Sequence, residues 1–239
     1  SALAAAPGAR WALHGDDTVE FAAALFGAWH AGKTTIVPGD AQPDTLARLR
    51  TQVDGWLGDL PGALRPAPVD AGGADWPALD AAAACLVVHT SGTSGEPLAI
   101  VKTLAQLDAE VHALERRFGT LCDTGLAPVN QDADDPGAVD FGEQAGRDAA
   151  DAPVRVWATA SHQHIYGLLF LALWPLAAGR LVDVEKLAYP EQMAERLGQG
   201  PSILVSSPAH LKRLPDTLDW AAARRCLRAI FRSEERRVG

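Results

Sequence analysis

Runs typical of buried β-strands alternate with helix-type patterns along most of this chain, and this alternation limits the folds open to it. The strand-type runs cover residues 34–37, 85–89, 154–159, 180–184, 203–206 and 227–231. Helix-type patterns, with apolar residues on one face, cover residues 18–31, 46–53, 103–118, 164–178, 191–197 and 209–214. Strand and helix in turn predict an α/β fold, in which a mainly parallel sheet forms one layer and helices flank it.

Composition sets the class of protein. The 239 residues are 48% hydrophobic, which is enough for a real core and excludes disorder along the whole chain. A net charge of −9 disfavours nucleic acid and the membrane surface as partners. The apolar run 165–178 is shorter than the roughly 20 residues of a membrane span. The first ten residues lack a signal-peptide pattern, and the three cysteines lack metal or disulfide spacing, so we expect a cytoplasmic protein with reduced thiols.

An acidic segment interrupts the alternation at residues 122–152. It contains eight Asp or Glu residues and one Arg, which together supply −7 of the net charge. The segment is also rich in Gly, Ala and Pro and shows no period, which is typical of a solvated, flexible insertion. A metal-binding acidic cluster is the alternative, although nothing in the pattern directs these carboxylates toward one point.

Two segments could bind phosphate, and the first has the wrong context. Residues 27–34 match the Walker A pattern letter for letter. That pattern binds phosphate only when a strand precedes the glycine loop and a helix follows it. Here a helix that begins after the capping residue Asp17 precedes Gly32, and a strand follows Thr34. We therefore interpret Gly32 as the residue that closes the helix and expect no nucleotide at Lys33.

The second segment, Thr90-Ser-Gly-Thr-Ser-Gly-Glu-Pro97, follows a buried strand. Its first six residues, the candidates for phosphate binding, are Thr90, Ser91, Gly92, Thr93, Ser94 and Gly95. Their backbone amides and hydroxyls can surround phosphate oxygens, and the glycines permit the close approach. The alternative interpretation is a flexible Ser/Gly turn.

This run resembles the phosphate loop of the adenylate-forming (AMP-binding) superfamily, which includes acyl-CoA synthetases, peptide-synthetase adenylation domains and luciferases. Three later segments resemble that family in the same order. His164-Ile-Tyr-Gly167 is similar to its His-x-x-Gly helix, residues 201–211 to a strand, proline and helix at the acyl pocket, and residues 227–231 to the strand before its adenine loop.

The resemblance implies an AMP-forming acid–thiol ligase that activates a fatty or aryl carboxylic acid. The acid would react with ATP, with Mg²⁺ bound, and the acyl group would pass to the thiol of CoA or of a carrier-protein phosphopantetheine arm. The loop Thr90 to Gly95 would hold the β- and γ-phosphates. His164 would lie beside the acyl carboxylate, with Gly167 lining the substrate site. Tyr166 could belong either to the core or to the pocket wall. His162 is expected to be solvated.

Some positions depart from the family pattern. The lysine that usually follows the loop's proline is Leu98, and Lys102 is a weak substitute. After Phe231 the sequence matches neither the adenine loop nor the Thr-Glu motif that helps to hold Mg²⁺. We expect residues 1–231 to be part of an N-terminal AMP-binding domain, residues 232–239 to be a tail foreign to it, and the chain alone to be inactive. A non-catalytic binding protein that keeps part of the fold is the alternative.

Overall fold

The computed structural model describes residues 2–66, 76–90, 98–124 and 152–232. It divides the chain into two compact units, and each unit contains two separate stretches of sequence. Unit 1 consists of Ser1–Glu110 and Ser161–Leu173, and unit 2 consists of Val111–Ala160 and Trp174–Gly239. Each unit contains its own sheet.

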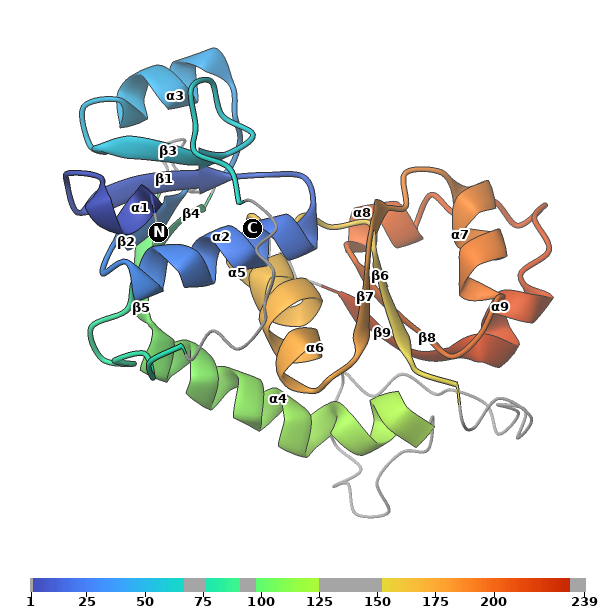
Figure 1. Cartoon of the computed structure of the whole chain (residues 1–239). Helices are drawn as coiled ribbons and strands as arrows, with labels where there is room; N and C mark the ends of the chain where they lie inside the picture. Colours follow the sequence, from blue (N-terminus) through green and yellow to red (C-terminus); the bar gives the residue numbers. More distant parts are fainter. Residues whose placement is uncertain (1, 67–75, 91–97, 125–151, 233–239) are drawn as a thin grey trace. The chain divides into compact units, whose positions relative to one another are not determined.

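Unit 1 is built on a five-stranded sheet with the order β3-β1-β2-β4-β5 (Figure 1). The strands are β1 (Arg10–His14), β2 (Thr34–Val37), β3 (Gly55–Gly58), β4 (Cys85–Thr90) and β5 (Leu98–Thr103). The first four are parallel, and β5 pairs antiparallel with β4. The sequence predicted β2 and β4 but missed the other three, so the mainly parallel α/β fold was predicted from only part of its strands.

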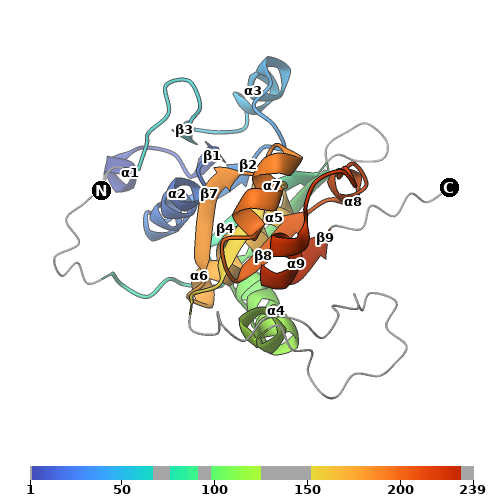
Figure 2. The ribbon, with the colours of Figure 1, turned by 90° about the vertical axis from the view of Figure 1, so that its right-hand side faces the viewer.

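Helices cover both faces of this sheet. They are α1 (Ala2–Ala5), α2 (Thr18–His30), α3 (Pro43–Leu49), the first turns of α4 (Leu104–Thr124), α5 (Ile165–Gly167) and the π-helix η2 (Leu168–Leu173). Figures 1 and 2 show α2 and α3 on opposite sides of β1 and β2, as right-handed crossovers require. Leu49 of α3 packs against Ile36 and Val87, while α2 buries Phe21 and Leu25.

Helix α2 begins and ends where the sequence predicts. The side chain of Asp17 accepts hydrogen bonds from the backbone N–H groups of Val19 and Glu20. Gly32 has a φ of +68°, which suits the residue just past a helix end. Lys33 Nζ donates to the carbonyls of Ala6 and Gly8, each at 2.7 Å. The order of helix, glycine and strand is therefore confirmed.

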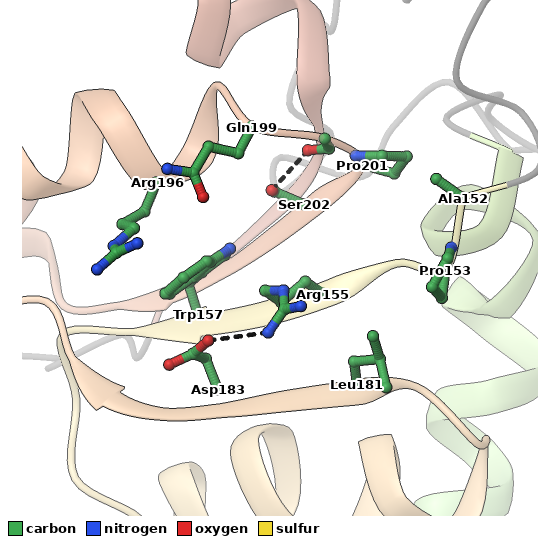
Figure 3. A pocket seen from close by; sticks show the side chains of 11 residues that line it. Ala152, Pro153, Arg155, Trp157, Leu181, Asp183, Arg196, Gln199, Pro201 and Ser202 are labelled. Atoms are coloured by element: carbon green, nitrogen blue, oxygen red, sulfur yellow. Dashed lines mark hydrogen bonds and ion pairs between the residues drawn. The ribbon is translucent and has the colours of Figure 1, made fainter.

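Unit 2 is built on a four-stranded parallel sheet with the order β7-β6-β8-β9. The strands are β6 (Arg155–Ala158), β7 (Leu181–Lys186), β8 (Ser202–Ser206) and β9 (Leu227–Arg232). The helices of this unit, besides the C-terminal part of α4, are α6 (Trp174–Ala177), α7 (Pro190–Leu197), α8 (Pro208–Leu211) and α9 (Ala221–Cys226). One face packs Trp157 and Leu204 against Met193 and Leu197 of α7 and Ala223 of α9. At their amino ends β6, β7 and β8 line a pocket (Figure 3).

Helix α4 starts at a reciprocal capping box, as its sequence predicts. The backbone N–H of Thr103 donates to Gln106 Oε1, and the N–H of Gln106 donates to Thr103 Oγ1. Residues 122–124 of the expected insertion form the last residues of this helix. Residues 125–151, the rest of that segment, lie outside the described residues.

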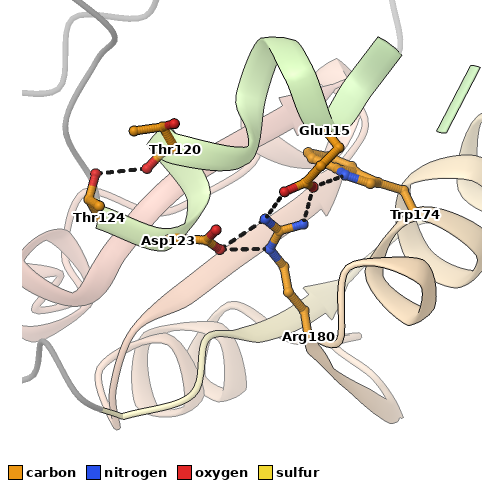
Figure 4. Close-up of polar contacts among 6 residues, drawn as sticks. All are labelled: Glu115, Thr120, Asp123, Thr124, Trp174 and Arg180. Atoms are coloured by element: carbon orange, nitrogen blue, oxygen red, sulfur yellow. Dashed lines mark hydrogen bonds and ion pairs between the residues drawn. The ribbon is translucent and has the colours of Figure 1, made fainter. Parts of the chain in front are cut away.

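A buried arginine joins the C-terminal part of α4 to the turn between α6 and β7 (Figure 4). The Arg180 side chain is 5% exposed, and its Nη atoms donate to both Glu115 oxygens, at 2.8 and 3.1 Å. Arg180 Nε and Nη2 both donate to Asp123 Oδ1, while Trp174 Nε1 donates to Glu115 Oε2. The guanidinium carbon also lies 5.2 Å from the ring centre of Trp174.

All three cysteines, Cys85, Cys122 and Cys226, are free thiols, as predicted. Within the described ranges, no helix combines the length and the apolar character that a membrane crossing needs.

Candidate functional site

The candidate site of unit 1 lies at the carboxyl edge of its parallel strands. His14 ends β1, Gly39 follows the end of β2, and Thr90 ends β4. Because β1, β2 and β4 are parallel neighbours, these three residues lie at one edge of the sheet. Ligands of open α/β sheets bind at this edge, outside the carboxyl ends of the strands.

His164 reaches this edge from a distant part of the sequence. A Cβ atom built on Gly39 would lie 3.5 Å from the carbonyl oxygen of His89 and 3.8 Å from Cε1 of His164. The imidazole therefore lies beside the end of β2, close to the residue that precedes Thr90. Sequence reasoning missed Gly39 and His89 as site residues, because the pairing of β2 with β4 that places them together is not visible in the local pattern.

The predicted phosphate loop starts at this same edge. Thr90 pairs with Leu98 across β4 and β5, so the chain leaves the sheet at Thr90 and returns to it at Leu98. Ser91, Gly92, Thr93, Ser94 and Gly95 lie outside the described residues, so their role stays a prediction.

His164 is the N-cap residue of α5. Its backbone is extended, with φ −105° and ψ 151°, and its carbonyl accepts from the N–H of Leu168 at 2.8 Å. Among the described residues, its imidazole has no hydrogen-bond partner, and its side chain does not cap the helix.

Gly167 permits a close approach of two backbone segments. A Cβ atom at this position would lie 2.0 Å from the carbonyl oxygen of Ser161, far inside van der Waals contact. The glycine of His-x-x-Gly therefore lets α5 pack onto the loop that carries His164. After Gly167 the helix widens into η2, so the predicted single helix 164–178 is three segments, α5, η2 and α6. Such π-type turns are frequent at functional sites.

His162 is buried, and its expected solvation is wrong. Its side chain is only 3% exposed. Its Nε2 lies 2.8 Å from the carbonyl oxygen of Gly15, and its Nδ1 lies 2.9 Å from Thr18 Oγ1. Since the carbonyl can only accept, Nε2 carries the proton and Nδ1 accepts from the hydroxyl. The neutral ring thus ties the loop before His164 to the loop between β1 and α2.

The burial of His162 makes unit 1 sensitive to acid. Burial lowers the pKa of His162, an effect that outweighs its hydrogen bond to Gly15 and the charges of Asp16 and Asp17. Its contribution to stability is complete above the unfolded value of about 6.5 and is lost as the pH falls below it. We expect the free energy of unfolding to fall by up to about 1.4 kcal/mol per pH unit in that range. Urea titrations of wild type and His162→Gln check this.

In that experiment, His162→Gln should be less stable at pH 7.5 and show a shallower acid slope. Part of the slope will remain, because burial also lowers the pKa of His14 against the opposing charges of Asp16, Asp59 and Asp40. Equal slopes in the two proteins would contradict the assignment.

Two other side chains that the resemblance singles out, Lys102 and Tyr166, have defined surroundings. Lys102, the weak substitute for the family's lysine, forms an ion pair with Glu110. The Tyr166 ring lies 4.7 Å from that of Phe170. The Tyr166 hydroxyl is buried without a hydrogen-bond partner in the described part of the chain, and burial raises its pKa. An acceptor of a bound molecule could satisfy this hydroxyl.

In unit 2, the segment similar to the family's acyl-pocket region folds as a strand, a proline and a helix. Strand β8 ends at Ser206, Ser207 caps α8, and Pro208 is the first residue of that helix. At the same carboxyl edge, Thr159 and Ser206 share a buried hydrogen bond of 2.8 Å. Among the described residues, no group of three His, Cys, Asp or Glu side chains could hold a metal ion.

Comparison with solved structures shows which proteins share this fold. A malonyl-CoA ligase in a ternary product complex with methylmalonyl-CoA and AMP is 22% identical, with a TM-score of 0.56 over 89% of this chain. ATP-bound MatB from Rhodopseudomonas palustris is 16% identical, with a TM-score of 0.55 over 97%. O-succinylbenzoate CoA synthetase (MenE) from Bacillus subtilis, in complex with AMP, is 15% identical, with a TM-score of 0.57 over 98%.

These matches cover only 42%, 46% and 57% of the three proteins, so the chain spans about half their length. The sequence matched no family model and no curated protein. At these identities the likeness establishes the fold. The chain has the α/β fold of the N-terminal domain of adenylate-forming enzymes, as the resemblance in its sequence predicted.

Proposed function

We propose that this chain belongs to the adenylate-forming superfamily and forms the phosphate- and acid-binding part of an AMP-forming acyl synthetase. The complete enzyme would join a fatty or aryl carboxylic acid to ATP. It would then transfer the acyl group to the thiol of CoA or of a carrier-protein phosphopantetheine arm. The proteins of similar fold include CoA ligases in complexes with AMP or ATP, which supports this reaction class.

One observation carries the proposal. His164 is more than 70 residues after Thr90, where the predicted phosphate loop begins. It lies against Gly39, which also neighbours the carbonyl of His89, the residue before that loop. His164 and Thr90, the first residue of the predicted loop, therefore lie at the same edge of the sheet, where α/β folds bind their ligands, and this supports the proposal.

In the reaction, a carboxylate oxygen of the acid attacks the α-phosphorus of ATP. A new P–O bond forms, the bond to the β-phosphate oxygen breaks, and pyrophosphate leaves with the electron pair. Amides and hydroxyls from Thr90 to Gly95 would hold the β- and γ-phosphates and stabilise the departing charge. His164 would donate a hydrogen bond to the carboxylate and orient it. Mg²⁺ would enter with ATP and neutralise phosphate charge.

The proposal keeps the expectation that residues 1–239 do not complete the reaction alone. In the adenylate-forming family, the adenine loop and the Thr-Glu motif follow the position that corresponds to residue 231. Residues 232–239 of this chain match neither motif. We therefore expect residues 1–239 to bind ATP and the acid without completing the reaction. A non-catalytic protein that binds ATP is the second candidate, and the mismatch of residues 232–239 with the adenine loop favours it.

The test measures ATP binding and exchange in one set of proteins. Calorimetry should show ATP binding to wild type, and the double variant Thr93→Ala/Ser94→Ala should weaken it at least about tenfold, or 1.4 kcal/mol. Thr217→Ala, at an exposed position of unit 2, is the matched control and should bind normally. Equal affinity in all three proteins, or none in wild type, overturns the proposal. Acid-dependent ATP–pyrophosphate exchange would contradict only the expected inactivity.

Lys33→Ala distinguishes this site from the Walker A match. The ammonium group of Lys33 donates hydrogen bonds to the backbone carbonyls of Ala6 and Gly8. We therefore expect calorimetry to give the same ATP affinity for Lys33→Ala as for wild type. Loss of these two bonds should lower the free energy of unfolding by about 1 kcal/mol. If Lys33→Ala lost most of its ATP affinity but kept normal stability, ATP would bind at Lys33 and not at the loop of residues 90–95.

A further inference from the structure

A pocket of about 390 Å³ lies in unit 2 at the opposite edge of the sheet from Thr159 and Ser206. Arg155 is paired with Leu181 and with Ser202, and these three residues begin β6, β7 and β8. The pocket is therefore at the amino ends of parallel strands, whereas the reaction proposed above uses carboxyl ends. The proposed function leaves this pocket unexplained.

The pocket wall contains a buried hydrogen-bond donor without a partner. Trp157 is 3% exposed, and its indole Nε1 has no hydrogen-bond partner among the described residues. Figure 3 shows this nitrogen on the side of the ring that faces Ser202. Leaving such a group unpaired is unfavourable, and an acceptor atom of a ligand would offset that cost.

Charge and shape indicate what kind of acceptor fits. Arg155 Nη1 pairs with Asp183 Oδ2 at 3.0 Å, and its guanidinium carbon lies 5.7 Å from the ring centre of Trp157. The Arg155 side chain stays 45% exposed, and Arg196 adds a second guanidinium to the lining. Two arginines and one aspartate give these side chains a net charge of +1, in a chain with a net charge of −9. Leu181 and Pro201 supply apolar surface beside them.

We propose that this pocket binds a small organic acid. One carboxylate or phosphate oxygen accepts from Trp157 Nε1, a second lies against the Arg155 guanidinium, and the apolar body of the acid packs on Leu181 and Pro201. The site is independent of ATP and of the loop at residues 90–95. This proposal therefore goes beyond the proposed function, and an experiment can support or overturn it whatever the outcome for ATP binding.

The test follows the indole N–H signals by NMR during titration with four-carbon probes. Butyrate, butyl phosphate and uncharged butyramide are added up to about 20 mM, which detects a Kd near 1 mM. We expect the Trp157 signal, identified by its loss in Trp157→Phe, to move downfield with an acid and to stay unchanged with butyramide. Movement with only one acid identifies its headgroup. No movement, or equal movement with butyramide, overturns the proposal.

Variants at the pocket check the assignment. Arg155→Gln, at an exposed strand start, should weaken acid binding at least tenfold while the sheet stays folded. Arg213→Gln, at an exposed position after α8, is its matched control. For Trp157→Phe the control is Trp76→Phe, because Trp76 is 59% exposed and lies in unit 1. Undiminished binding in Arg155→Gln would also overturn the proposal.

Discussion

Gly167→Ala is expected to lower the free energy of unfolding by about 3 kcal/mol, because the new methyl group overlaps backbone that cannot move aside. The Cβ position is 2.0 Å from the Ser161 carbonyl oxygen, 2.6 Å from its carbon and 3.0 Å from the His162 nitrogen. Relief requires α5 to separate from the loop before it, which displaces His164. Urea unfolding measures the loss, and calorimetry should show weaker binding of the acid substrate.

The same substitution at Gly27 is the control. Gly27 lies inside α2, and a Cβ there meets nothing within 4 Å. Gly27→Ala should therefore raise stability by about 0.5–1 kcal/mol, the usual gain from alanine in a helix. If the two variants shifted stability in the same direction, the close approach at Gly167 would not exist as described.

Arg180→Ala should cost about 3 kcal/mol of stability. The variant removes a guanidinium with a 5% exposed side chain and leaves Glu115 and Asp123 without their shared partner. Both carboxylates are about half-exposed, so water recovers part of the loss, and the cost stays below that of a fully buried pair. Trp174 also loses the group that orients its hydrogen-bond acceptor. Urea unfolding of wild type and Arg180→Ala, monitored by tryptophan fluorescence, measures the loss of stability.

Two further variants identify the cause. Arg180→Lys keeps the charge but cannot bind both carboxylates through a planar fork, so most of the loss should persist. Arg65→Ala removes an exposed ion pair with Asp59 and should cost less than about 1 kcal/mol. The Arg180 hydrogen bonds hold the pKa of Glu115 below its usual range. Wild type should therefore lose stability as the pH falls through the lower range of carboxyl titration, and Arg180→Ala should lose less.

Of the nine described strands, the sequence predicted six, which are β2, β4, β6, β7, β8 and β9. β2, β4, β6 and β8 read as continuous apolar runs because helices or strands cover them from both sides. β1, β3 and β5 were missed. β3 contains two glycines, and β5 is an antiparallel strand whose Leu98 and Val101 are more than 60% exposed. Their assignment depends on neighbours that a local pattern does not contain.

Local features of the chain were also predicted better than contacts between residues far apart in the sequence. The capping residues Asp17 and Thr103, the closing Gly32 and the N-cap His164 all act within one turn of a helix, and their positions were predicted. His162 was misjudged because its partners, Gly15 and Thr18, are more than 140 residues away in sequence. Gly39 was missed for the same reason, since only the folded chain brings His164 to it.

The division of the chain affects how it can fold during synthesis. Unit 1 lacks its last stretch, Ser161–Leu173, until the ribosome has made all of unit 2's first stretch, Val111–Ala160. That late stretch supplies η2, which packs on α2, and His162, whose ring meets Phe21 at 4.6 Å. A nascent chain that has emerged only as far as α4 therefore carries an incomplete N-terminal core, and we expect chaperones to engage it before residue 173 leaves the exit tunnel.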